Sequence, residues 1–141
     1  MTPPPVPSPA SPAAVARILH GALFASAIAI AGLGWMFRGG FPIPDGTGGA
    51  VTFAAYALAA SGLLAGVAAR RLIPERPSAE SADDWWRKHL PKALAAWAIG
   101  EGTVLIGALV LGLGGQPVAA LLVVLAGVAV LIATAPSRLV P

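Results

Sequence analysis

Glu101 is the residue whose type and position could most readily do chemistry. It lies ten residues after Pro91 in the string AIGEGTVLIG, inside a long apolar stretch. At about 1.5 Å of helical rise per residue, it would lie roughly 15 Å deep in a hydrocarbon core about 30 Å thick. A charge near the bilayer midplane costs on the order of 2.5–3.5 kcal/mol, so such a residue usually faces a partner inside the protein.

The sequence leaves several roles open for this carboxyl group. It could take up and release a proton or bind a cation, as intramembrane carboxylates do in transport proteins. It could instead be protonated and hold the helices in register, and Ser26, Tyr56 and Ser61 lie at a similar expected depth as partners. Contact with a neighbouring subunit or a bound cofactor is a third role. We favour the structural role, because no second titratable group clearly shares the expected depth of Glu101.

His20 is the second candidate. It lies about two turns into the first apolar stretch and could ligate a pigment or a haem iron, or serve as a packing residue. The chain has no cysteine, so disulfides and thiolate metal sites are excluded. No metal site is expected, because the acidic residues and the two histidines are scattered along the chain. No nucleophile–base pair or phosphate-binding loop is visible, so we expect no enzyme; the sequence leaves the cofactor unknown.

The composition predicts a membrane protein. Of the 141 residues, 57% are hydrophobic and 11% are charged, and the mean hydropathy is +0.80. A soluble domain carries about 25% charged residues, and a chain of this size could not hide so much apolar surface from water. The net charge of +3 depends on a handful of Lys and Arg residues, and we do not expect nucleic-acid binding.

The apolar segments predict an all-α fold, a four-helix transmembrane bundle built from two αα-hairpins. A Pro-rich tail at residues 1–12 precedes a single membrane domain at residues 13–141, and Ser11 is the expected N-cap of the first helix. The tail would be either disordered or an arm that lies on a neighbouring subunit. The four crossings are expected at about residues 13–37, 50–69, 91–113 and 117–135.

The polar linker at residues 70–92 predicts a short interfacial helix on the cytoplasmic side. Ser81 and Asp84 form a capping-box pattern at the start of that helix. Pro91 either separates the helix from the third crossing or kinks one continuous helix. Aromatic side chains favour the membrane–water interface, so four tryptophans are expected as interfacial anchors: Trp35, Trp85, Trp86 and Trp97.

Small residues predict close contacts between helices. Gly62 and Gly66 have GxxxG spacing, which lets helix backbones approach one another. Gly100 and Gly102 flank Glu101 and would let another backbone or a ligand come near it. We expect ordinary packing within the chain from Gly62 and Gly66 rather than dimerisation.

The basic residues predict the orientation. The linker carries six Lys or Arg residues, whereas the other two loops together carry only Arg38. By the positive-inside rule, this linker and both termini would be cytoplasmic. The expected location is the inner (plasma) membrane of a bacterium, with the lipid bilayer and other membrane subunits as partners.

Two resemblances arise in the second half. The string Ala98 to Gly102, followed by Ile106-Gly107 and Leu109-Val110, is similar to the carboxylate-bearing helix of rotary ATPase proteolipid subunits. The helix order differs, so that function is not carried over. The whole second half, with Pro136 to Arg138 as a basic tail, resembles small four-helix bacterial membrane proteins without an established activity. Small multidrug transporters also have four helices and a membrane Glu, but theirs lies in the first helix.

These observations favour a non-enzymatic accessory or structural subunit of a larger bacterial membrane complex. An energy-transducing complex is one candidate for that complex. The first alternative is a small ion- or proton-coupled transporter that works through Glu101. The second is a pigment- or haem-binding membrane subunit that uses His20.

Overall fold

The fold is entirely helical in the residues that the computed structural model describes, which are 10–38, 40, 46–114 and 116–140. This confirms the predicted all-α class. Most of the predicted Pro-rich tail lies outside the described residues. The helices are α1 (Pro12–Met36), α2 (Gly48–Arg71), α3 (Ala82–Gly112), α4 (Pro117–Ala133) and α5 (Pro136–Leu139).

Three of these helices are long and apolar enough to cross a membrane, which indicates a membrane protein. They are α1 with 25 residues, α2 with 24 and α3 with 31. Helix α4 is also apolar but has 17 residues, which corresponds to about 25 Å of helical rise. The structure thus supports three candidate crossings, where the sequence predicts four.

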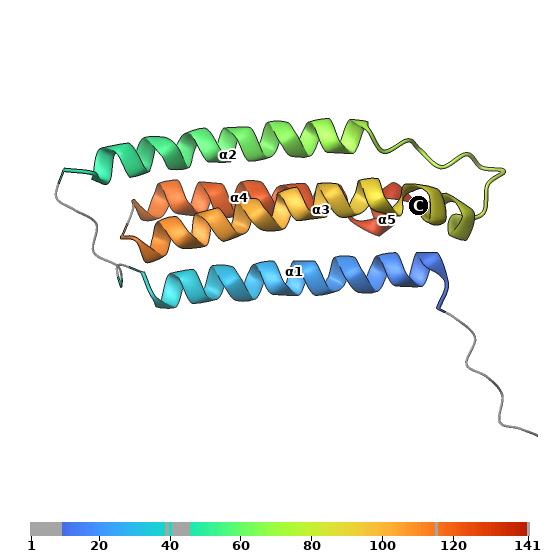
Figure 1. The fold of residues 1–141 in the computed structure, drawn as a ribbon, viewed down its shortest axis with the longest axis horizontal. Helices are drawn as coiled ribbons and strands as arrows, with labels where there is room; N and C mark the ends of the chain where they lie inside the picture. Colours follow the sequence, from blue (N-terminus) through green and yellow to red (C-terminus); the bar gives the residue numbers. More distant parts are fainter. Residues whose placement is uncertain (1–9, 39, 41–45, 115, 141) are drawn as a thin grey trace, which may run out of the picture.

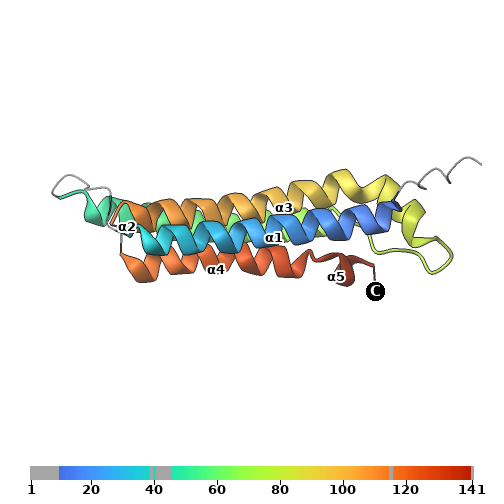
Figure 2. The same cartoon turned by 90° about the horizontal axis from the view of Figure 1, so that it is seen from below.

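The helices pack as a central pair with one helix on each side (Figure 1). Helices α3 and α4 form the pair, α1 packs mainly on α3, and α2 packs on both α4 and α3. Helices α1 and α2 lie on opposite sides of the pair (Figures 1 and 2). Because α1 and α3 run in one direction and α2 and α4 in the other, the segment between α2 and α3 lies at the same end as the start of α1.

Glycines set the close approach of α3 to α4. A Cβ atom at Gly100 would lie 2.8 Å from Leu131 Cγ and 3.1 Å from the Gly127 carbonyl oxygen. A Cβ atom at Gly127 would lie 2.5 Å from the Gly100 carbonyl oxygen. Both distances to oxygen are shorter than an ordinary van der Waals contact, so the two backbones touch where neither residue has a side chain.

The outer helices also dock through small residues. Gly62 and Gly66 of α2 are buried, and a Cβ atom at either one would collide with the side chain of Thr103 or Val130, respectively. Gly34 of α1 lies against the backbone of Ala108 in the same way. Gly102 differs from the expectation, because a Cβ atom there would meet nothing within 4 Å.

Both predicted N-caps are present. The Ser11 hydroxyl accepts a hydrogen bond from the Ala14 N–H at 3.3 Å, and the Ser81 hydroxyl accepts one from the Asp84 N–H at 3.1 Å. The start of α1 receives a further cap from α3, since Asp83 Oδ1 accepts the Ala13 N–H at 3.1 Å. The first turns of α1 and α3 are therefore fixed to each other as well as capped individually.

The predicted interfacial helix is not a separate element. Helix α3 runs without a break from Ala82 to Gly112 and contains Pro91. Proline lacks the N–H that would bond to the carbonyl four residues earlier. Packing offsets that loss, because Trp85 and Trp86, before the proline, and Ala93, Ala96 and Trp97, after it, are all buried in one core cluster. Helix α5, which the sequence does not predict, covers this cluster with Leu139.

Candidate functional site

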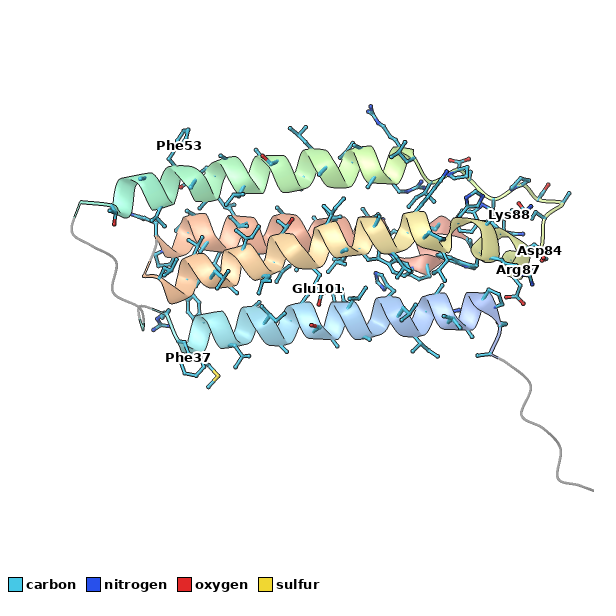
Figure 3. The ribbon with its side chains drawn as sticks, viewed as in Figure 1. Phe37, Phe53, Asp84, Arg87, Lys88 and Glu101 are labelled. Carbon is cyan, nitrogen blue, oxygen red and sulfur yellow. The ribbon has the colours of Figure 1, made fainter. Side chains whose placement is uncertain are left out.

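Glu101 lies on α3 at the boundary with α1. Its side chain extends from α3 toward α1 in Figure 3 and is partly buried. Among the residues that the structure describes, Glu101 has neither a hydrogen-bond partner nor an ion-pair partner. A half-buried carboxyl group without a partner is unusual, because buried polar side chains are normally hydrogen-bonded.

None of the three predicted partners forms a hydrogen bond with Glu101 in the described part of the chain. The Ser61 hydroxyl donates to the Ala57 carbonyl of its own helix at 2.8 Å. Tyr56 is 47% exposed on α2, on the far side of the α3–α4 pair from α1 (Figure 1). Ser26 is on α1, but no hydrogen bond involving it occurs within the described part of the chain. A similar expected depth in the membrane does not bring two side chains together, because it does not determine which way each helix face points.

His20 is held in a defined orientation between α1, α3 and α4. Its Nε2 lies 3.0 Å from the Leu131 carbonyl oxygen. A carbonyl oxygen can only accept, so Nε2 carries the proton and donates. The imidazole also stacks on Phe24, at a centroid distance of 6.2 Å, and meets the edge of Trp97 at 5.1 Å. Nε2 is therefore occupied, and Nδ1 is the ring nitrogen that remains for any ligand.

Three tryptophans form a buried cluster at the start of α3, and their expected role as interfacial anchors stays a prediction. Trp85, Trp86 and Trp97 are 0–2% exposed. The Trp85 and Trp86 rings are 5.0 Å apart, and the Trp86 and Trp97 rings are 6.1 Å apart. Trp97 Nε1 donates to the Thr134 carbonyl at 2.8 Å. The polar handle of Trp97 is thus satisfied by the end of α4 and needs no lipid headgroup.

Trp35 is the exposed member of the predicted set of anchors. It is 45% exposed near the end of α1. The Arg38 guanidinium lies 4.6 Å from the centroid of its ring, in a cation–π contact. Its place at a membrane interface stays a prediction.

An apolar groove runs between α1 and α3 on the same face as Glu101. We call it the α1–α3 groove; its volume is about 680 Å³, and its lining residues are Ile30, Leu33, Gly34, Phe37, Leu105, Ala108, Leu109, Gly112 and Leu113. Residues four and seven apart share one face of a helix, so Glu101 lies one turn before Leu105 and two turns before Ala108 on that face. Glu101 is not a lining residue, but its position along α3 is one helical turn from the inner end of the groove.

The opposite end of α3 is strongly polar. Two ion pairs form there, Arg87 with Asp84 at 2.7 Å and Lys88 with Glu80 at 2.5 Å (Figure 3). These turns precede the apolar part of α3 that begins after Lys92, in which Glu101 is the single charged residue. The hydrogen bond from the Ser81 hydroxyl lowers the pKa of Asp84, and the nearby positive charge of Arg87 acts in the same direction. The hydrogen bond and charge of Glu80 raise the pKa of Lys88.

The described residues contain no group of three or more His, Asp or Glu side chains that could hold a metal ion. Apart from Arg38, which contacts Trp35, the charged side chains of the described residues lie at two places. One is the isolated carboxyl of Glu101 beside the α1–α3 groove, and the other is the basic end of the molecule.

Comparison with known proteins adds no assignment. No protein-family model matches the chain, and searches of curated proteins and of solved structures found no match either. What the chain does must therefore be inferred from its own geometry.

Proposed function

We propose that the chain is a multi-pass protein of the bacterial inner membrane with four crossings and both ends in the cytoplasm. A charge-free length of about 30 Å of helical rise separates Arg17 from Arg38 along α1, which matches a hydrocarbon core. The stretch from Lys92 to Gly112 in α3 has about the same length, and Glu101 is its single charge. Glu101 lies about 14 Å past Lys92, near the midplane of such a core.

The basic residues support this orientation. The first turns of α1 and α3, the end of α2 and the residues that follow α4 share one end of the structure (Figure 1). Every Lys and Arg residue except Arg38 lies within the first eleven residues of α1 or α3, at the end of α2, in the linker that follows α2, or after α4. The positive-inside rule places such an end in the cytoplasm. Helix α4 is at the lower limit of length for a crossing, about 17 residues, and Arg138 follows it at the basic end.

We infer that the protein is a non-enzymatic accessory subunit that binds a transmembrane helix of a larger complex in the α1–α3 groove. The observation that carries this proposal is the unpartnered carboxyl of Glu101. A partner helix that supplies a hydrogen-bond donor would satisfy the carboxyl group, and interhelical hydrogen bonds of this kind contribute about 1–2 kcal/mol in model peptides.

The groove defines the chemistry of that helix. Gly34 and Ala108 in its lining already pack against each other, and Gly112 is the remaining small residue. The other lining residues are large and apolar, so the partner should be an apolar helix. It should carry one hydroxyl, amide or cationic side chain at the level of Glu101, near the middle of the membrane.

Copurification tests the proposal. The tagged chain is extracted from its native membrane in a mild detergent, and the molar ratio of each copurifying membrane protein to the chain is measured. Glu101→Ala should lower the ratio of one partner on the order of tenfold, since a difference of 1.4 kcal/mol is a factor of ten in affinity. Glu75→Ala is the matched control, because Glu75 is exposed in the linker outside the apolar helices.

Two results would overturn the proposal. One is a monodisperse chain that copurifies with no other membrane protein in stoichiometric amount. The other is proton-coupled flux by the purified chain alone in liposomes that Glu101→Gln abolishes, because that result makes Glu101 a transport site rather than a binding residue.

A further inference from the structure

A second pocket lies at the basic end of the molecule, far from the α1–α3 groove along the helix axis. Its volume is about 630 Å³, and it lies between the first turns of α1, the start of α3, the linker, and the junction of α4 with α5. The residues that matter to the argument are Arg17, His20, Arg76, Trp86, Pro136 and Ser137. We call it the basic pocket.

Two guanidinium groups from distant parts of the sequence line this pocket. Arg17 makes no hydrogen bond or ion pair with any other described residue. Arg76 uses Nη1 to donate to the Glu80 carbonyl at 2.6 Å, whereas its Nε is buried without a hydrogen-bond partner. The Arg17 guanidinium and the Nε of Arg76 thus lack hydrogen-bond partners among the described residues, and a buried donor without a partner is costly.

No carboxylate is among the lining residues. Two acidic residues are next to the lining in sequence: Glu75 is exposed, and Asp83 Oδ1 accepts the Ala13 N–H at 3.1 Å. Neither carboxylate forms an ion pair with Arg17 or Arg76 within the described residues. An anion from outside the chain would supply the acceptors that the two guanidinium groups lack, and arginine matches the oxygens of phosphate groups in a bidentate geometry.

The remaining wall suits a molecule with an apolar part next to its anionic group. Trp86, which is 2% exposed, and Pro136 present apolar surface, and Ser137 adds a hydroxyl. The pocket lies at the end of the charge-free helix segments, where the headgroups of the cytoplasmic leaflet would be if the chain crosses the membrane as proposed above. Basic pockets between helices on the cytoplasmic side are a known kind of anionic-lipid site.

We propose that the basic pocket binds the phosphate group of one anionic phospholipid of the cytoplasmic leaflet. Arg17 and Arg76 hold the phosphate oxygens, and the wall formed by Trp86 and Pro136 contacts the glycerol part of the lipid. This inference uses the membrane orientation of the proposed function, but it does not depend on the partner helix or on Glu101.

Lipid titration tests the proposal on the purified full-length chain. The protein in a neutral detergent is titrated with phosphatidylglycerol, with phosphatidylcholine and with inorganic phosphate, and binding is followed by native mass spectrometry. Phosphatidylglycerol should bind at one molecule per chain. Arg17→Gln should weaken this binding about fivefold, since a basic residue near an anionic lipid contributes about 1 kcal/mol.

Arg17 is exposed, so its replacement should leave the fold intact. Arg76→Gln is the second variant, with circular dichroism as the check on folding. Arg71→Gln is the matched control, because Arg71 is an exposed arginine at the same end that does not line the basic pocket. Arg71→Gln should leave the binding of phosphatidylglycerol unchanged.

Saturable binding of phosphatidylglycerol that Arg17→Gln weakens and Arg71→Gln does not supports the proposal. Binding of inorganic phosphate alone, equal binding of phosphatidylcholine, or equal losses in all arginine variants would overturn it. Loss of partner copurification in Glu101→Ala with unchanged lipid binding separates this inference from the proposed function.

Discussion

The contact between α3 and α4 allows a sharp test of the structure through one added methyl group. Gly127→Ala places a Cβ atom 2.5 Å from the Gly100 carbonyl oxygen and 2.7 Å from both the backbone nitrogen and Cγ2 of Val104. Two of these three atoms belong to the backbone of α3, so a rotamer change cannot relieve the contacts. The helices must move apart by about 1 Å to restore ordinary separations of 3.5–4.0 Å.

The cost can be estimated from two opposing effects. Overpacking in a well-packed core typically costs about 1–3 kcal/mol, and backbone collisions favour the upper end of that range. Alanine is a better helix former than glycine by about 1 kcal/mol, which offsets part of this cost. The free energy of unfolding of Gly127→Ala should therefore fall by about 2 kcal/mol.

Gly102→Ala is the matched control for this substitution. Gly102 is also a helical glycine of the same core region, but a Cβ atom there meets nothing within 4 Å. The control retains the gain in helix propensity without the collision, so it should raise the free energy of unfolding by up to about 1 kcal/mol. Reversible unfolding by sodium dodecyl sulfate in mixed micelles, followed by circular dichroism, measures both variants against the native chain.

The difference between the two variants is the decisive quantity, because the propensity effect cancels in it. A Gly127→Ala protein that is stabilised as much as the Gly102→Ala protein would refute the close approach of α3 to α4. Equal losses in both variants would also contradict the reasoning, since they would mean that α3 has a close contact on the face that carries Gly102.

Two further substitutions test the other ends of the same helices. Trp97→Phe should lower the free energy of unfolding by about 1–3 kcal/mol in the same micelle assay, because it leaves the buried Thr134 carbonyl without the indole donor. No change in stability would mean that water or another donor replaces the indole. Asp84→Asn should destabilise the chain at neutral pH but not in acid. The folded-state pKa of Asp84 is lowered from 3.8, so its stabilising effect is present above that value and is lost as the pH falls through the folded-state pKa. Unfolding curves of both proteins over a pH series measure this, and a difference that persists in strong acid would contradict the assignment.

Local sequence signals predicted the helices and their starts. Ser11 and Ser81 cap the helices as expected, because an N-cap depends on the few residues that follow it. The apolar stretches define α1, α2 and α4 to within two residues of the expected ends. These features need no information about the rest of the fold.

Features that depend on the packing of helices do not follow from local sequence signals. Trp85 and Trp86 have the composition of interfacial anchors, but they are buried because the first turns of α3 belong to the core cluster. Pro91 left two possibilities open, and burial on both sides of it decided for one continuous helix. A proline costs one hydrogen bond, and the packing of neighbouring side chains determines whether a helix can continue through it.

The sequence by itself determined that this chain is helical and apolar, that six of its nine Lys and Arg residues lie in the linker at residues 70–92, and that Glu101 is isolated within an apolar stretch. Those properties follow from residue type and spacing. Only the tertiary structure decided that Glu101 lies beside a groove without a partner in the described chain, and that Arg17 and Arg76 meet in one pocket. Residues far apart in the sequence come together through the rotation and register of packed helices, which depend on contacts such as that of Gly100 with Gly127 rather than on any local pattern.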